Sequence, residues 1–398
     1  MANVPFDQIK GAGKIFLLGS EINQDNAVVG FMIHNAKLKK GIPVGLITTK
    51  AESSMAHKAD EVMVIKSYYH FIKAVNHYLV TKNLHNALFI RDNCTGFEEY
   101  RAGLLKESFA GLLGAAGTVN ADDVIRFADS YNEEQHAIIV YSEKELATNA
   151  CTELFNLTLI TGKLGKTSSG LISLKEKNNS HGQFDMGICM AFGVGSISVK
   201  DEDLIAKLKK SWKVDRLPET VNMDIYDRLD DRMLKNVFIF GEDPIGCAID
   251  RAQTSELLSR AAFMVVQDYF MTETAKQAHL ILPASFPVES GGSFTNTQKV
   301  IQEFGAEFSP AVEKTSLAQI ADLLRAEGLE QSADHHEVLA EVLSLLPEGK
   351  EIVYSFCNTA GDNPNRLYEH GCDYIVKRFD EEFAAAFETK NVENYERV

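Results

Sequence analysis

The sequence predicts an α/β protein with two parallel-sheet domains and a short carboxyl-terminal extension. Short apolar runs alternate with helical stretches along most of the chain, a pattern that favours parallel strands covered by helices. The order strand, helix, strand begins near Ile15 and begins again near Val237, which predicts two Rossmann-like sheets. A chain of 398 residues, 45% of them hydrophobic, is long enough for two or three domains. We expect domains at residues 1–175 and 176–330, and an extension at 331–398.

The first domain is expected to open with a strand, a helix and a second strand. A strand at residues 15–18 precedes a turn at Gly19-Ser20, and Gly41 and Pro43 lead into the next strand. A helix that ends at Gly162, a natural C-cap, is followed by a glycine-rich loop. The predicted strands are 15–18, 44–47, 62–65 and 137–141, and the predicted helices are 27–40, 68–80, 121–131 and 146–160.

The sheet of the second domain is expected to begin after a charged, helical stretch at residues 199–235. Its first strand, 237–240, ends at Gly241-Glu242-Asp243-Pro244, and its last apolar run stops at Pro283, which cannot continue a central strand. Gly291 and Gly292 predict a flexible loop before a polar Thr295-Asn296-Thr297. The other predicted elements are strands 263–266, 280–282 and 352–356 and helices 253–259, 273–278 and 374–387, the last of them amphipathic.

Composition excludes several classes of partner. The formal charge of −16 disfavours nucleic acid and anionic membranes. No apolar run approaches the roughly 18 residues that cross a bilayer, and the first ten residues lack a secretory signal pattern, so we expect a cytoplasmic location without direct membrane insertion. The six cysteines have no cluster or metal spacing and are expected to be reduced and mostly buried, Cys247 among them. His335 and His336 adjoin on a predicted helix, where neighbouring side chains diverge, so solvent exposure is expected there and no metal site is assigned.

Several segments carry a resemblance to a known family. Residues 265–284 read VVQDYFMTETAKQAHLILPA and are followed by ESGGSFTNT at 289–297, while residues 161–187 read TGKLGKTSSGLISLKEKNNSHGQFDMG. Together with GEDP at 241–244 and the opening segment, these resemble the molybdopterin oxidoreductase family, including formate dehydrogenases and the large redox subunit of NADH:quinone oxidoreductase. The resemblance covers residues from about 5 to 328. It implies loops that in the family hold molybdopterin guanine dinucleotides. If this chain still binds part of such a cofactor, as one half of a split enzyme, the expected contacts are Lys175, Asn178, Asn179, Asp185, Gln267, Asp268 and Thr295.

The departures from the family pattern are as informative as the matches. Glu21 and Asp25 enter a loop that the resemblance places against an anionic dinucleotide, which is electrostatically adverse. Thr48-Thr49-Lys50 replaces the family's base-binding D-P-R, and Lys175 replaces an arginine without its planar fork. No cysteine here matches a family cluster or molybdenum ligand. We therefore expect no cofactor, metal or catalytic residue in this chain.

Two function classes follow from the resemblance. In the first, the chain is a non-catalytic platform in a multisubunit electron-transfer complex, derived from a formate dehydrogenase-like catalytic subunit and assembled with iron-sulfur and/or flavin subunits. In the alternative, it is one half of a split molybdopterin enzyme that binds part of a bis-molybdopterin guanine dinucleotide. The segments that match favour the alternative, and the altered nucleotide loops favour the platform.

Overall fold

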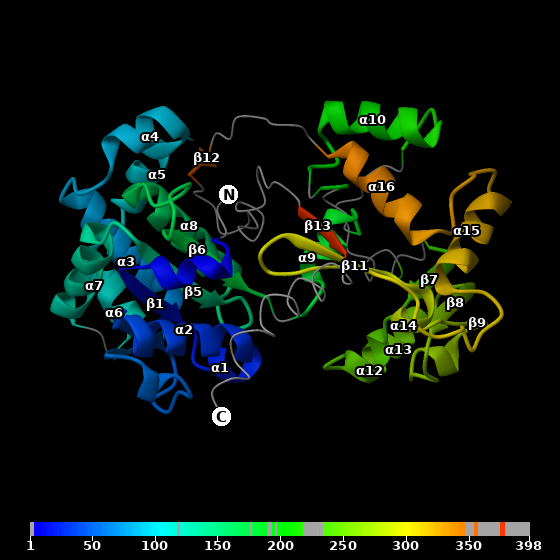
Figure 1. Cartoon of the computed structure of the whole chain (residues 1–398), viewed down its shortest axis with the longest axis horizontal. Coiled ribbons are helices and arrows are strands. Elements are labelled where there is room, and N and C mark those ends of the chain that lie inside the picture. Colours follow the sequence, from blue (N-terminus) through cyan, green and yellow to red (C-terminus); the bar gives the residue numbers. More distant parts are fainter. Residues whose placement is uncertain are drawn as a thin grey trace, which may run out of the picture. The chain divides into compact units, whose positions relative to one another are not determined.

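The computed structural model describes residues 4–117, 120–175, 177–188, 193–195, 197–217, 229, 234–346, 354–356 and 375–378. The chain divides into two compact units (Figure 1). The first comprises Met1–His181, Thr295–Val300 and Glu348–Ile375, and the second comprises Gly182–Phe294, Ile301–Pro347 and Val376–Val398. The first boundary lies close to the predicted one at 175, and residues beyond 331 are shared between the two units.

The first unit is built on a five-stranded parallel sheet with the order β3-β2-β1-β5-β6. The order reverses between β1 and β5, so the loops that leave these two strands flank the topological switch point. A two-stranded parallel pair, β4 with β12, lies in the same unit. The strands are β1 (Lys14–Leu18), β2 (Val44–Thr48), β3 (Glu61–Val64), β4 (Cys94–Thr95), β5 (Ala137–Ser142), β6 (Gly170–Leu174) and β12 (Tyr354–Ser355).

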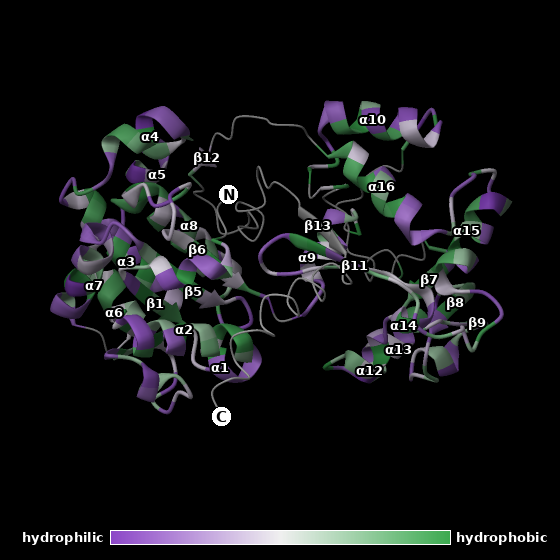
Figure 2. Ribbon diagram, in the orientation of Figure 1, coloured by the Kyte–Doolittle hydropathy of each residue, from purple (hydrophilic) through white to green (hydrophobic). Residues whose placement is uncertain are grey.

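Helices cover both faces of this sheet. Alternate residues of β1 point to opposite sides, so that Phe16 packs in one core with α3, α7 and α8 while Leu17 packs in a second core with α2. Helical segments in this unit show hydrophilic and hydrophobic residues side by side (Figure 2), as expected for helices that cover a sheet. They are η1 (Phe6–Gly11), α1 (Ile22–Asp25), α2 (Ala27–Lys40), η2 (Ala56–Lys58), α3 (Tyr68–Thr81), α4 (Ala87–Asn93), α5 (Phe97–Leu104), α6 (Phe109–Ala116), α7 (Ala121–Glu133) and α8 (Thr148–Thr161).

The second unit has a three-stranded parallel sheet with the order β7-β8-β9. The prediction of an α/β protein with two parallel sheets is therefore confirmed. The helix α9 (Ser180–Asp185) lies where the chain passes from one unit to the other. The strands are β7 (Asn236–Phe240), β8 (Phe263–Asp268) and β9 (Leu280–Pro283), and the helical segments are α10 (Glu202–Trp212), α12 (Pro244–Cys247), α13 (Arg251–Leu258), η3 (Ala275–Gln277), α14 (Pro287–Ser290), α15 (Ser316–Ala326) and α16 (His335–Leu345).

One face of the second sheet is buried in a core, and the other is only partly covered: Val265 and Gln267 of β8 are buried on it, whereas residues of β7 are exposed. Val237 and Ile239 of β7 point into a core with Val266 of β8. The aromatic residues between them point the other way: Phe238 is 49% exposed and Phe240 is 42% exposed. Phe263 and Leu280 of the neighbouring strands are exposed as well.

Two predictions about the later part of the chain are wrong. The predicted flexible loop at Gly291 and Gly292 instead leads directly into β10 (Gly292–Thr295), which pairs with β11 (Val300–Phe304). The predicted amphipathic helix 374–387 begins as the strand β13 (Ile375–Arg378), which extends the same sheet in the order β10-β11-β13. The β-branched pair Ile375-Val376 favours a strand at that point. The remainder of that predicted helix lies outside the described residues.

Within the described ranges, no helix combines the length and the apolar character that crossing a bilayer requires.

Candidate functional site

The loop after β1 holds a carboxylate from the loop after β5. The backbone N–H groups of Ser20 and Glu21 both donate to Glu145 Oε1, at 2.6 and 3.1 Å. Successive amides at the carboxyl end of a first strand are the groups that hold a phosphate in dinucleotide-binding domains. The chain's own carboxylate is therefore bound where such a domain binds an anion.

The surrounding residues fix this arrangement. Gly19 has φ +144°, and a Cβ at that position would lie 3.0 Å from Ser142 Cβ and 3.4 Å from Glu145 Oε1, so a side chain would crowd the approach of the two loops. Ser20 Oγ and Thr48 Oγ1 are 2.7 Å apart and join the ends of β1 and β2. Burial, together with the charge of Glu145, raises the pKa of Tyr68, whose hydroxyl donates to Glu145 Oε2 at 3.4 Å. Tyr68 thus remains a neutral donor toward the carboxylate.

Lysines at this edge of the sheet are paired with acidic residues of the same chain. Lys50 Nζ lies 3.3 Å from Glu21 Oε1, and Lys144 Nζ lies 3.1 Å from Asp25 Oδ1. The acidic residues that looked adverse in the sequence are therefore balanced by neighbouring lysines.

The most buried of these pairs is Lys175 with Glu143. Its N–O distance is 2.7 Å, and the two side chains are 6% and 12% exposed. Glu143 also accepts from Ser173 Oγ. Lys175, which the resemblance implies as a cofactor contact, is thus paired with Glu143, the residue that directly follows β5.

Three of the predicted contact residues line one pocket of about 270 Å³ in the first unit: Lys175, Asn178 and Thr295. A fourth, Asn179, supports the pocket because its Oδ1 accepts from Thr295 N at 2.9 Å. The Thr295 hydroxyl is buried and has no hydrogen-bond partner among the described residues. Drug-sized ligands commonly occupy about 300–1,000 Å³, so this pocket suits part of a dinucleotide and not a whole one.

The other predicted contacts lie in the second unit and serve its internal structure. Asp185 is buried at the end of α9, and its backbone carbonyl accepts from Gly195 N at 2.8 Å. Gln267 Nε2 donates to Gln319 Oε1 at 2.9 Å. Asp268 Oδ1 accepts from Phe270 N at 3.2 Å, which closes the turn after β8. Gln267 and Asp268 are thus bonded to neighbouring elements of their own unit.

The loop after β7 is stabilised by Asp243. Its Oδ1 accepts from Gly246 N and Thr274 N, both at 3.0 Å, and from Thr274 Oγ1 at 2.6 Å. Partial burial opposes ionisation, but these hydrogen bonds prevail and lower the pKa of Asp243. The GEDP segment is therefore a helix cap that also ties β7 to the turn after β8.

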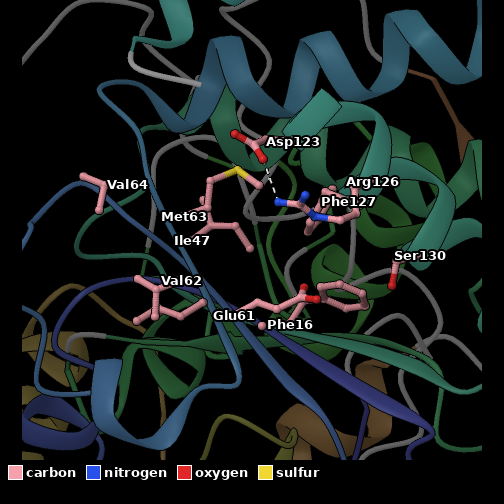
Figure 3. Close-up of a pocket in the computed structure, with 12 residues that line it drawn as sticks. Phe16, Ile47, Glu61, Val62, Met63, Val64, Asp123, Arg126, Phe127 and Ser130 are labelled. Atoms are coloured by element: carbon pink, nitrogen blue, oxygen red, sulfur yellow. Dashed lines mark hydrogen bonds and ion pairs between the residues drawn. The ribbon is translucent and has the colours of Figure 1, made fainter. Parts of the chain in front are cut away.

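A further pocket of about 230 Å³ lies on the flank of the first sheet, between β2, β3 and α7 (Figure 3). Its charged residues include Asp123 and Arg126, which form an ion pair at 2.6 Å, and Glu61, which lies 3.5 Å from Lys14. This pocket lies along β2 and β3, and its one lining serine, Ser130, accepts from Lys14 Nζ at 2.9 Å.

Two expectations about single residues are wrong. Cys247 is exposed, because α12 is a single turn at the surface of the second unit. Cys151 is buried and Cys94 half-buried, and burial raises the pKa of both thiols to about 12.

The side chains of His335 and His336 do not diverge: their ring centroids are 4.0 Å apart. They occupy the first turn of α16, where His335 is half-buried and only His336 is exposed.

The sequence prediction misses Glu143 and Glu145. The available signal was the charged run Glu143-Lys144-Glu145 directly after a predicted strand. Only the strand order, which sets β5 beside β1, shows that this run meets the loop after β1.

Comparison with known proteins supports the resemblance. The sequence model described as molybdopterin oxidoreductase matches residues 1–325. The F420-dependent formate dehydrogenase subunit alpha of Methanocaldococcus jannaschii is 28% identical over 303 residues, which are 74% of this chain and 44% of that protein. A Staphylococcus aureus protein with a provisional formate dehydrogenase name is 26% identical over 353 residues, 86% of this chain and 36% of that protein. The chain thus spans less than half the length of these curated relatives.

A solved structure shares the fold. Acetylene hydratase from Pelobacter acetylenicus superimposes with a TM-score of 0.59 at 16% identity, over 82% of this chain and 48% of that one.

Proposed function

The chain belongs to the molybdopterin oxidoreductase family, and from that premise we propose that it is a non-catalytic platform subunit of a multisubunit electron-transfer oxidoreductase complex. The observation that carries the proposal is the Glu145 carboxylate, bound by the amides of Ser20 and Glu21 at the switch point of the first sheet. A pyrophosphate at those amides would have to displace a carboxylate and then face its negative charge.

The residues at this edge do not fit a molybdopterin guanine dinucleotide. Two amides that could hold its phosphates bind Glu145, and Lys50, Lys144 and Lys175 pair with acidic residues of the chain. An incoming anion that took Lys175 would break a buried ion pair and leave the Glu143 carboxylate uncompensated. We therefore assign no catalytic step to this chain.

A partner surface is available in the second unit. Phe238, Phe240 and Phe263 are exposed on the face of the sheet opposite its core, with Phe238 and Phe240 stacked at a centroid distance of 6.4 Å. Contiguous exposed aromatic residues mark interaction sites in folded proteins. In the proposed complex this face contacts another subunit, of the iron-sulfur or flavin class.

A second candidate function is one half of a split, formate dehydrogenase-like enzyme that binds part of a bis-molybdopterin guanine dinucleotide. The pocket lined by Lys175, Asn178 and Thr295, with the buried Thr295 hydroxyl, favours it. In that case substitution of Asn178 by alanine or of Thr295 by valine would lower the pterin content of the purified complex.

The decisive test is cofactor analysis of the native complex and of the full chain purified alone. We expect neither molybdenum nor tungsten, and no pterin released by acid oxidation, in stoichiometric amount with this chain. Equimolar pterin in the isolated full chain would overturn the platform and favour the split enzyme.

A binding experiment tests the Glu145 argument directly. Glu145→Ala frees two amide donors, so the variant should bind inorganic pyrophosphate at least about tenfold more tightly than the wild type, since hydrogen bonds to charged groups contribute roughly 1.5–3 kcal/mol. Glu145→Gln is the matched control, because its amide oxygen still accepts from both N–H groups and should give a smaller gain. Equal pyrophosphate affinity in the wild type and Glu145→Ala would show that the carboxylate does not block the site.

A further inference from the structure

Three side chains that could ligate a metal meet in the second unit. Glu303 comes from β11, and His335 and His336 come from the first turn of α16. One ligand atom from each residue can be chosen so that all three lie within 4.8 Å of one another. His336 Nδ1 contacts Glu303 Oε1 directly.

The cluster is partly buried. The Glu303 side chain is only 7% exposed, whereas that of His336 is 49% exposed. His335 Nε2 is buried and has no hydrogen-bond partner among the described residues. The contact with Glu303 gives His336 Nδ1 a partner, but it provides none for the buried His335 Nε2. A buried polar atom of this kind normally has a hydrogen-bond partner or a metal.

The turn at Gly291 leaves room for the His335 ring because position 291 has no side chain. Gly291 has φ +70°, and a Cβ there would lie 2.6 Å from His335 Cε1 and 2.9 Å from His335 Nε2. The glycine thus allows the ring to pack against the turn before β10. A larger residue at position 291 would collide with the His335 ring where it now lies.

We propose that Glu303, His335 and His336 form a binding site for a divalent transition metal, with zinc as the best-suited ion. Two imidazole nitrogens and one carboxylate oxygen are ligands that zinc accepts, and a three-residue set leaves a fourth tetrahedral position for water, which the exposure of His336 permits. Zn–N distances of about 2.0–2.1 Å set neighbouring ligands roughly 3.3 Å apart, so small side-chain rotations from the observed spacing suffice.

The electrostatic surroundings tolerate a cation at this helix start. The positive end of a helix opposes a metal ion. Here the N-cap Asp334 accepts from His336 N at 2.8 Å and from Glu337 N at 3.2 Å, so its carboxylate offsets that end of the helix. A bound ion would join α16 to β11, which otherwise belong to separate stretches of the chain.

The test uses the full chain, freed of metal by chelation and desalted. We expect calorimetric titration with zinc chloride to show one equivalent bound with micromolar or tighter affinity, and cobalt(II) to develop the visible bands of a four-coordinate site. His335→Gln and Glu303→Gln should each weaken zinc binding by roughly 100-fold, because loss of a ligand should reach at least the 10–100-fold cost of losing a residue that supports one. His336→Gln, at the exposed position, provides a variant that leaves the buried packing intact.

Two controls separate the site from general histidine and carboxylate binding. Glu337→Gln removes a carboxylate next to His336 that is not part of the cluster, and His57→Gln removes an exposed histidine of the first unit. Both should retain the wild-type affinity for zinc. Absence of stoichiometric zinc binding in the wild type, or undiminished binding in folded His335→Gln and His336→Gln, would overturn the proposal and leave the cluster as an ion pair.

Discussion

The two parallel sheets of this protein follow the same strand–helix–strand rule but differ in how their faces are covered. In the five-stranded sheet, every residue of β2, β5 and β6 is buried, because helices pack on both sides. In the three-stranded sheet, β7 alternates between exposed and buried residues, and its exposed positions are phenylalanines at 238 and 240. The first sheet is covered on both sides, whereas the second leaves the phenylalanines of β7 exposed beside Val265 and Gln267 of β8, which are buried on the same face.

The loops at the ends of β1 and β7 are also stabilised in different ways. Glu145 reaches the amides of Ser20 and Glu21 from a loop 125 positions away in the chain, so it fills an anion position by tertiary contact. Asp243 binds amides of its own turn and of the next loop, as a cap does. The first edge is therefore closed by a contact across 125 positions of the chain, and the second by contacts across 3 and 31 positions.

The largest contrast is expected between matched phenylalanine substitutions in the two sheets. Phe16 is 2% exposed and packs edge-on against Phe127 and Tyr131, so Phe16→Ala should lower the free energy of unfolding by about 3–5 kcal/mol. Phe240→Ala, at 42% exposure, should cost less than about 1 kcal/mol in the isolated chain. Chemical denaturation of both variants measures the difference. A similar cost at Phe240 would mean that its face is covered within the chain itself.

Ion pairs provide the second contrast. Lys175→Met leaves Glu143 buried without its cation and should cost about 3 kcal/mol. Lys276→Met breaks a 2.6 Å pair with Glu273 whose side chains are 54% and 51% exposed, and should cost no more than about 1 kcal/mol. Urea midpoints at low and high salt check both values. Salt should reduce the contribution of the Lys276 pair and leave that of Lys175 nearly unchanged.

The sequence predicted the regular elements of the first sheet because their signals are local. The apolar runs that become β1, β2 and β5 are bounded by turn residues, and the helix that becomes α8 ends at Gly162, which adopts φ +61° as a C-cap. The strand β13 was mistaken for a helix because its apolar residues, read with those that follow, fit a helical stripe. Pairing with β11 decided the outcome, and such long-range pairing is not visible in local periodicity.

The residues of the candidate sites were likewise predicted only in part. Lys175, Asn178 and Thr295 were predicted from the resemblance and do line one pocket, whereas Gln267 and Asp268 are bonded within their own unit. Glu145 and the Glu303–His335–His336 cluster were not predicted, because each joins residues far apart in sequence. The adjacent histidines gave a misleading signal, since the first turn of the helix places ligand atoms of both rings within 4.8 Å of a Glu303 carboxylate oxygen.

The third prediction concerns the cap of the second sheet. Asp243→Ala should cost about 1 kcal/mol, and Asp243→Asn should cost less because the amide oxygen still accepts from Gly246 and Thr274. The pKa of Asp243 is lowered in the folded state, so its contribution is fully present above the unfolded value of 3.8 and is lost as pH falls through the folded pKa. Stability measured from pH 6 downward should therefore decline more steeply in the wild type than in Asp243→Asn. Parallel curves for the two proteins would contradict this assignment.

The smallest effect, with the opposite sign, is expected at Glu153 in the first unit. Burial raises the pKa of this carboxyl even though Tyr100 and Asn76 donate to its Oε2 at 2.6 and 2.9 Å. The unfolded chain therefore releases this proton at a lower pH than the folded chain does, and stability falls as pH rises from the unfolded value of 4.5 through the folded pKa. Glu153→Gln keeps an acceptor for both donors without the charge, so it should change the free energy of unfolding by less than about 1 kcal/mol at pH 7.

The pH dependence gives the sharper readout for this residue. Denaturation at several pH values should show the stability of Glu153→Gln rising relative to the wild type as pH increases above 4.5, because only the wild type must bury a charge. A difference that shrinks with increasing pH would mean that Glu153 is stabilised as a carboxylate by its neighbours. Glu153 in the first unit and Asp243 in the second would then both be stabilised in their ionised form, and the expected difference between the two carboxyl groups would be absent.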